Sequence, residues 1–219
     1  MTRPTQAASA EPRRGERGYS LVALLALMTV MMIAMMAAAP SLQQQSRRER
    51  ELEAVARGEE VAEAIRLYIR YKGQPPTSMH DLTDGVTPRF STKKVYVLRA
   101  SAACDPLMSH DGECGEWRTI KVNDSTLANF VRQLALYNDG HLPAPTRDPA
   151  LLPFAQQLPR LTGILDLGST DEAPGGDEDD STSSDGPFIG VASRSHRASV
   201  ITYYGIERRD QWVFTPFFR

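Results

Sequence analysis

The chain has 219 residues, of which 24% are charged, and its formal net charge at pH 7 is −2. This balance gives no overall basic field that would attract nucleic acid, and no cluster of Lys and Arg with interleaved aromatic residues is present, so we expect no nucleic-acid partner. The first quarter of the sequence differs in character from the rest, and the remaining length suits one globular domain.

Residues 1–18 are polar and contain four arginines and two glutamates, so no folded element is expected there. They are followed by YSLVALLALMTVMMIAMMAAA, an uncharged run of 21 residues that covers residues 19–39. A helix of this length measures about 32 Å at about 1.5 Å per residue, which matches the hydrocarbon core of a bilayer. The run therefore predicts one membrane span.

A secretory signal peptide is the alternative interpretation of this beginning, because basic residues precede the apolar run and three alanines end it. The apolar region of a signal peptide is usually only about 7–15 residues long. The run here is longer, and the strongest change in character precedes it, at Gly18 and Tyr19. Charge counting does not fix the orientation, since four arginines lie before the run and four follow it closely.

Residues 41–72 are rich in Glu, Arg, Ala, Leu and Gln, which favour a helix. We expect the helix to continue to about Tyr71 and to end at Gly73, ahead of Pro75 and Pro76. Its apolar residues recur at helical spacing and predict a buried stripe that packs on a β-sheet: Leu52, Val55, Ala62, Ile65 and Ile69.

Residues 73–219 alternate short helical and strand-like segments. Thr77 or Ser78 can cap a short helix, and Ser125 can cap an amphipathic helix over residues 125–137, whereas residues 138–159 are Pro-rich and mostly irregular. β-rich runs predict strands, the last three closing the domain as antiparallel strands, at residues 94–98, 116–122, 188–191, 199–204 and 211–214. The predicted fold class is α+β, with a long N-terminal helix packed on a C-terminal antiparallel sheet.

Residues 169–186, STDEAPGGDEDDSTSSDG, hold seven acidic residues and no aromatic or aliphatic residue larger than Ala. Such a segment cannot bury enough surface to offset its chain entropy, so it predicts a mobile acidic loop. Its carboxylates are of the kind that calcium prefers. Against calcium, residues 177–180 lack the ligand spacing of an EF-hand, and a solvated acidic run is the simpler interpretation.

The two cysteines, Cys104 and Cys114, enclose nine residues in CDPLMSHDGEC. A disulfide is sterically plausible and would restrain the unfolded chain by roughly 2–3 kcal/mol in an oxidising compartment. The alternatives are two free thiols or half of a zinc site. A zinc site normally has four N or S ligands and only His110 is nearby, so we predict no metal site.

No pattern of catalytic residues is recognisable. The sequence contains no GxSxG, HExxH or GxxxxGK[ST] motif, which removes support for a hydrolase, a zinc protease or a P-loop enzyme. The histidines are scattered through polar surroundings and are expected on the surface, so we predict no enzyme: His80, His110, His141 and His196.

The junction Gly18-Tyr19-Ser20-Leu21-Val22, followed by the apolar run, resembles the N-terminus of type IV pilins and type II secretion pseudopilins. Pro40, the twenty-second residue counted from Tyr19, matches a proline that kinks the long helix in many members. Later patches are also similar to pseudopilins, the last one more loosely: residues 75–82, 105–106, 115–118 and 190–214.

The resemblance implies that residues 1–18 are a leader, which a prepilin peptidase removes after Gly18 on the cytoplasmic side. The mature chain would then begin at Tyr19 with a methylated amine. Residues 19–40 would form the single inner-membrane span, residues 41–72 the amphipathic half of the helix, and residues 73–219 a periplasmic or extracellular domain. The implied partners are other pilin or pseudopilin subunits, the peptidase, an inner-membrane assembly platform and lipid. Calcium, which major pseudopilins bind in a C-terminal loop, is the one cofactor that the resemblance raises.

The sequence departs from the family at Ala23, the fifth mature position, where members usually have Glu. That carboxylate is thought to pair with the N-terminal amine of a neighbouring subunit, because a lone charge in lipid is expensive. Some minor pseudopilins at the filament tip also lack it. The resemblance thus implies a structural subunit of a type II secretion pseudopilus or a type IV pilus-like filament, in a minor or tip-proximal position. A single-span envelope protein that never polymerises is the alternative, and a secreted enzyme is the third.

Overall fold

The chain divides into two compact units, residues 1–46 and residues 47–219, and the second unit is called the head below. The predicted leader and most of the predicted acidic loop lie outside the described residues. The computed structural model describes the following residues, without the side chains of residues 19 and 37–42: 19–88, 91–109, 113–141, 148–158 and 186–218.

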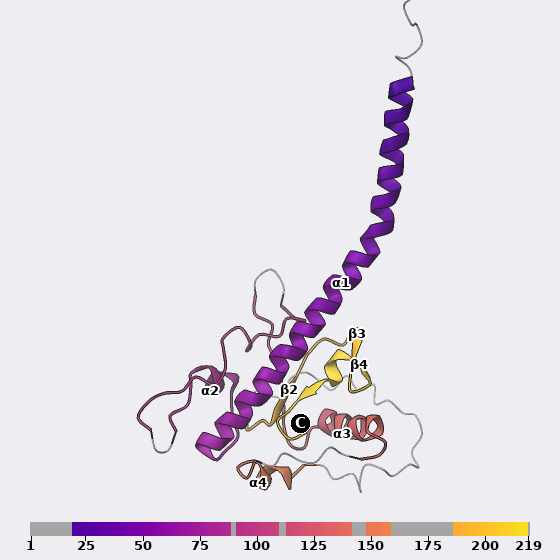
Figure 1. Cartoon of the computed structure of the whole chain (residues 1–219). Coiled ribbons are helices and arrows are strands. Elements are labelled where there is room, and N and C mark those ends of the chain that lie inside the picture. Colours follow the sequence, from indigo (N-terminus) through magenta and orange to yellow (C-terminus); the bar gives the residue numbers. More distant parts are fainter. Residues whose placement is uncertain (1–18, 89–90, 110–112, 142–147, 159–185, 219) are drawn as a thin grey trace, which may run out of the picture. The chain divides into compact units, whose positions relative to one another are not determined.

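Helix α1 spans Tyr19–Lys72 and contributes to both units (Figure 1). It is rich in Ala, Leu, Met, Glu and Arg, which lose little conformational freedom in a helix. The helix continues through Pro40, and the predicted kink there stays a prediction because this side chain is not described. The helix ends at Gly73 as predicted: this residue has a left-handed φ of 77°, and its N–H donates to the Ile69 carbonyl at 2.7 Å.

The part of α1 that lies in the head buries a stripe that differs from the predicted one. Leu52 was predicted to be buried but is 51% exposed, whereas the neighbouring Glu51 is fully buried. The stripe continues at helical spacing through Gly58, which lies against the ring of Phe214. Its apolar members, all buried, are Ala54, Val61, Ala62, Ala64, Ile65, Tyr68 and Ile69.

Three shorter α-helices complete the described helical part of the head. Helix α2, Met79–Thr83, is capped by Ser78, which forms a capping box with Asp81. Helix α3 spans Ser125–Tyr137 as predicted, but its cap is Asp124, whose carboxylate accepts from the Thr126 N–H, and not Ser125. Helix α4 is the short Leu152–Ala155.

The described strands form two small sheets. One has the antiparallel order β1-β2-β5, and the other is the hairpin of β3 and β4, which turns at Tyr204 and Gly205 with φ of 49° and 76°. A one-turn 3-10 helix, η1 (Arg209–Gln211), links β4 to β5. The strands are β1 Arg118–Ile120, β2 Gly190–Ala192, β3 Ala198–Tyr203, β4 Ile206–Arg208 and β5 Val213–Phe214.

Two strand predictions were wrong. The C-terminal runs do not close the domain as three neighbouring strands, because β3 and β4 pair only with each other and leave β2 beside β1 and β5. Residues 94–98 form no strand, since within the described residues only the bridge between Val86 and Val95 holds them. A β-prone run needs a partner strand, and none of the described strands lies alongside it.

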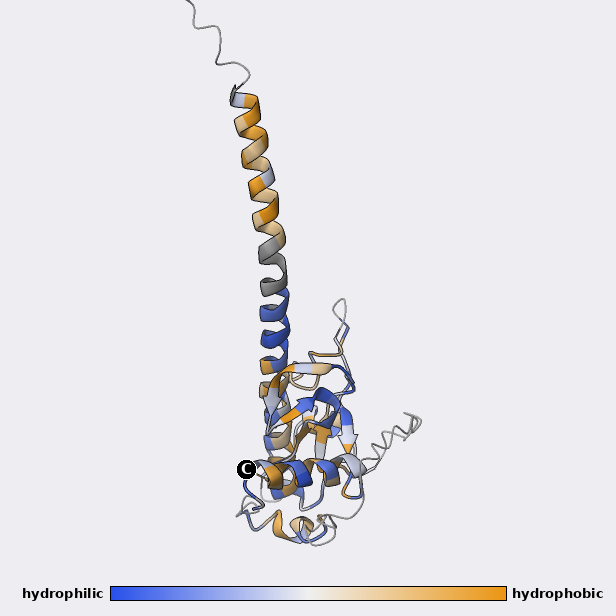
Figure 2. Ribbon diagram, turned by 90° about the vertical axis from the view of Figure 1, so that its right-hand side faces the viewer, coloured by the Kyte–Doolittle hydropathy of each residue, from blue (hydrophilic) through white to orange (hydrophobic). Residues whose placement is uncertain are grey.

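The head is a mixed α+β domain with one core. The buried apolar side chains of this core include residues of α1, α3 and both sheets, and both Trp indoles satisfy their N–H within the core. Trp117 donates to the Ala102 carbonyl at 3.0 Å, and Trp212 donates to the Ile206 carbonyl at 2.9 Å. Figure 2 shows apolar residues, in orange, on the part of α1 within the head and on the elements around it.

Candidate functional site

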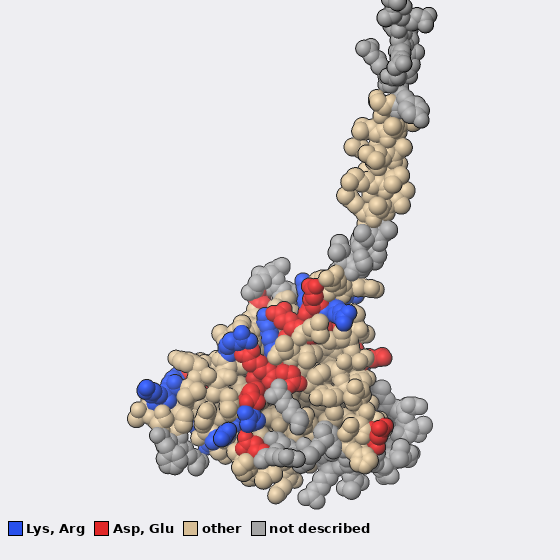
Figure 3. All heavy atoms as spheres, viewed as in Figure 1, with Lys and Arg blue, Asp and Glu red and all other residues tan. Residues whose placement is uncertain are grey.

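The first candidate site is the apolar segment, defined here as residues 20–36 of α1. Every residue in it is exposed, and the segment carries no ionisable side chain (Figure 3). Its large apolar side chains are 53–77% exposed: Leu21, Val22, Leu24, Leu25, Leu27, Met28, Val30, Met31, Met32, Ile33, Met35 and Met36. Because these residues follow one another along the helix, they cover all of its sides.

The apolar segment has almost no polar side chain that needs to be hydrated. Ser20 and Thr29 carry its only side-chain hydroxyls, and the Thr29 hydroxyl donates to the Ala26 carbonyl of its own helix at 2.8 Å. Moving a large apolar side chain out of water contributes about 1.5–3 kcal/mol. This surface therefore suits lipid or other apolar helices.

No helix within the described residues combines the length and the apolarity that a membrane crossing requires. The apolar run of the sequence covers residues 19–39, and the side chains of residues 19 and 37–39 are not among those described.

The predicted processing and assembly residues lie at the start of α1. Gly18 lies outside the described residues, and Tyr19 is the first residue of the helix. Ala23 follows Tyr19 by four residues, so the two positions share one face of α1, and Ala23 is exposed. Pro40 is a helical residue of α1 whose side chain is not described. The first turn of α1 contains no acidic residue.

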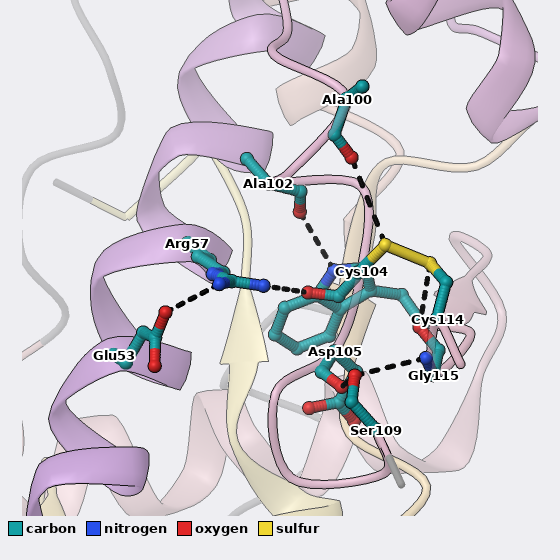
Figure 4. The surroundings of a disulfide bond; sticks show 10 residues. Glu53, Arg57, Ala100, Ala102, Cys104, Asp105, Ser109, Cys114 and Gly115 are labelled. Carbon is teal, nitrogen blue, oxygen red and sulfur yellow. Dashed lines mark hydrogen bonds and ion pairs between the residues drawn. A yellow bond between two sulfur atoms is a disulfide. The ribbon is translucent and has the colours of Figure 1, made fainter. Parts of the chain in front are cut away.

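The second candidate site is the disulfide between Cys104 and Cys114, whose sulfur atoms are 2.00 Å apart (Figure 4). The backbone pairs at the base of the ring, since Cys104 bridges Glu116 and the Asp105 N–H donates to the Gly115 carbonyl at 2.7 Å. This paired base, residues 104–105 and 115–116, is called the neck below. Arg57 of α1 donates to the Cys104 carbonyl at 3.2 Å and thereby ties the neck to the long helix.

Asp105, the residue after Cys104, is a buried carboxylate. It accepts from the Ser193 hydroxyl at 2.6 Å, from the Leu107 N–H at 2.9 Å and from the Arg194 backbone. Burial raises the pKa of Asp105 above its ordinary value, although these hydrogen bonds and the charge of Arg209 oppose the rise. Asp105 thus joins the neck to the residue that follows β2.

Glu51 is the most important residue that the sequence analysis missed. Its carboxylate is fully buried, forms an ion pair with Arg209 and accepts from the N–H groups of Val200 and Ile201 at 2.9–3.0 Å. Val200 and Ile201 lie between Ala198 and Tyr203, where the register of the β3–β4 pairing is irregular. The available signal was its position, three residues before Ala54 on the buried stripe.

The three described histidines do not gather into a site. His80 lies 2.9 Å from the Asp84 carboxylate and His196 lies 3.3 Å from the Asp210 carboxylate, and both imidazoles are more than 70% exposed. His141 is exposed too, and His110 lies outside the described residues. Among the described residues, no three His, Cys, Asp or Glu side chains are grouped as metal ligands would be.

No family model and no curated protein matches the sequence, and no solved structure matches the chain. Function is therefore argued from this chain alone. Its two distinctive features are a helix with an exposed apolar segment and a head in which a disulfide ring is tied to that same helix.

Proposed function

We propose that the chain is a structural subunit of a type II secretion pseudopilus or a type IV pilus-like filament. One observation carries the proposal: the apolar segment is exposed and apolar on all its sides. A helix that is apolar all round is stable when lipid or other helices surround it. The Gly18-Tyr19 junction directly before the helix adds the prepilin pattern.

In this proposal the chain passes through two environments. The peptidase removes residues 1–18, and residues 19–40 hold the mature subunit in the inner membrane, with the head on the periplasmic or extracellular side. An assembly platform driven by a cytoplasmic ATPase then extracts the subunit. The apolar helix halves bundle in the filament core, which keeps their side chains out of water, and the heads pack around them. The role is structural and needs no catalytic group.

Ala23 places the subunit at a minor or tip-proximal position within this proposal. A carboxylate at this position would need a cationic partner in lipid, whereas Ala23 is uncharged and needs none. Ala23 is also the observation that favours the alternative, a single-span envelope protein that never polymerises. The amount of this chain in sheared filaments, measured by quantitative mass spectrometry against the major subunit, separates the two. A minor subunit is present at a few copies per filament, whereas an envelope protein is absent.

Sequencing of the mature N-terminus tests the processing step. With the prepilin peptidase present, the mature chain begins at Tyr19 with a methylated amine, and without the peptidase Met1 is retained. Gly18→Leu blocks cleavage because it changes the residue at the scissile bond, whereas the matched control Gly15→Leu in the same leader is processed normally. A mature start near Pro40, or an intact chain in the presence of the peptidase, contradicts the proposal.

A further inference from the structure

The two cysteines of the disulfide differ in exposure. Cys114 and the preceding Glu113 are exposed, whereas Cys104 is half-buried and its carbonyl is held by Arg57. Thiol–disulfide exchange requires a thiolate to approach one sulfur while the other leaves. Cys114 is the more exposed of the two residues, so we expect the thiolate to attack the sulfur of Cys114 and the sulfur of Cys104 to leave.

The half-buried side of the ring is tied to three parts of the head, and Figure 4 shows the contact with Arg57 of α1. Arg57 of α1 contacts the Cys104 carbonyl, Ser193 binds the Asp105 carboxylate, and the Trp117 indole donates to the Ala102 carbonyl. The N–H of Gly115, a buried residue of the neck, donates to the Ser109 hydroxyl of the ring at 3.1 Å. The neck is therefore the place where closing the ring acts on α1 and on the residues after β2.

We propose that the Cys104–Cys114 disulfide is a thiol–disulfide exchange site, opened and closed through Cys114, and that its closure keeps the neck bound to α1. The partner it fits is a protein or small molecule with a reactive thiol or disulfide in an oxidising compartment. This inference is independent of the filament role and holds for an envelope protein as well.

The exchange is balanced in both directions. In opening, a partner thiolate bonds to the Cys114 sulfur, the Cys104–Cys114 bond breaks, and Cys104 leaves as a thiolate that takes up a proton. In closing, the Cys114 thiolate attacks a partner disulfide, and one partner thiol leaves. Cys104 then displaces the second, so the two electrons pass to the partner. The released Cys104 thiol has an acceptor within reach, because its sulfur lies 3.8 Å from the Ala100 carbonyl.

The site of exchange is tested on the full-length oxidised chain in detergent micelles, with reduced glutathione as the probe. After a short incubation the thiols are blocked with N-ethylmaleimide, and the glutathione adduct is located by peptide mass spectrometry. We expect at least ten times more adduct on Cys114 than on Cys104. Equal labelling, labelling of Cys104, or no adduct while the chain stays folded overturns the proposal, and no variant is needed.

The effect on the neck is tested by amide hydrogen exchange of the same chain before and after reduction. A ring with a sequence separation of 10 restricts the open chain about 100-fold by the loop-entropy model, so the Asp105 amide should exchange up to about 100 times faster when the bond is reduced. The Ile189 amide, which donates to the Ile120 carbonyl between β1 and β2, is the internal control and should stay protected. Unchanged exchange at Asp105, or equal loss at both amides, overturns the role of the bond at the neck.

Discussion

Glu51 shows how one buried side chain can organise elements that are distant in sequence. Its carboxylate on α1 neutralises Arg209 and accepts two N–H groups of β3, so three partners depend on one group. A buried ion pair is weak evidence for net stabilisation, because desolvation offsets the attraction. Removing one member of the pair is strongly destabilising, since the other charge is left buried and unpaired.

Glu51→Ala should therefore lower the free energy of unfolding by about 3–5 kcal/mol. The matched control is Glu53→Ala on the same helix, where the side chain is 50% exposed and pairs with Arg57 at the surface, and it should change that free energy by less than about 1 kcal/mol. Urea unfolding of the full chain in detergent, followed by Trp fluorescence, measures both. Similar midpoints for the two variants would rule out a central role for Glu51.

Asp105 gives the stability of the head a specific pH dependence. Its pKa is raised in the folded chain by burial, so the folded state binds the proton more tightly than the unfolded state does. The stabilisation linked to this proton is fully present below the unfolded pKa, near 3.9, and is lost as pH rises through the folded pKa.

Asp105→Asn removes this titration while keeping the size of the side chain. The free energy of unfolding of the wild type, relative to the variant, should fall as pH rises from about 3 through the folded pKa, by about 1.4 kcal/mol per unit of pKa rise. Chemical unfolding of both proteins at a series of pH values measures the difference. A difference that stays constant with pH, or that grows in favour of the wild type, would contradict the assignment.

At the scale of elements, α1 and α3 could be predicted almost to the residue, because each is one continuous run with helix-forming residues and clear ends. The predicted stripe failed at Leu52 because hydrophobicity alone places a Leu inside and a Glu outside. The partner that buries Glu51 is Arg209, which lies 158 residues further along the chain. Such long-range pairing leaves no local pattern.

Strands were harder to predict for the same reason. β2 pairs with β1, about seventy residues earlier. In the part of the chain that the structure describes, the β-prone residues 94–98 pair only through the bridge at Val95. The disulfide was easier to anticipate, because a chain with two closely spaced cysteines has only one intramolecular pairing to consider. The neck around it, with Asp105 and Ser193, depends on tertiary contacts and could not be anticipated.

The approach of α1 to β5 is limited by Gly58. A Cβ at this position would lie 2.3 Å from the Phe214 ring, which is closer than any real contact. Gly58→Ala should therefore destabilise the head by about 1–3 kcal/mol through overpacking, although Ala favours a helix over Gly by about 1 kcal/mol. Ala56→Gly, at an exposed position of the same helix, isolates the propensity effect and should cost about 1 kcal/mol. Thermal unfolding compares the two, and a stabilised Gly58→Ala variant would disprove the close packing.

For the molecule as a whole, the proposed function requires the apolar segment to hold the chain in a membrane. Met28→Arg puts a charge in the middle of this segment, which should disfavour insertion by about 2.5–3.5 kcal/mol. We expect a large fall in the amount of chain that stays with membranes after carbonate extraction. Gln43→Arg, an exposed position of α1 beyond the apolar run, is the control and should behave like the wild type. Equal membrane fractions for both variants would refute the anchoring role.

The absence of a loop within α1 has a mechanical consequence. The helix continues from Tyr19 to Lys72, although Pro40 lacks a backbone N–H and removes one hydrogen bond, so a pulling force on the apolar end reaches the head through the helix itself. Glu51 is the first residue of the buried stripe that such a force would meet. Its bonds to Arg209 and β3 would carry the load before the apolar contacts behind them, so Glu51 is the point from which a stretched subunit would begin to yield.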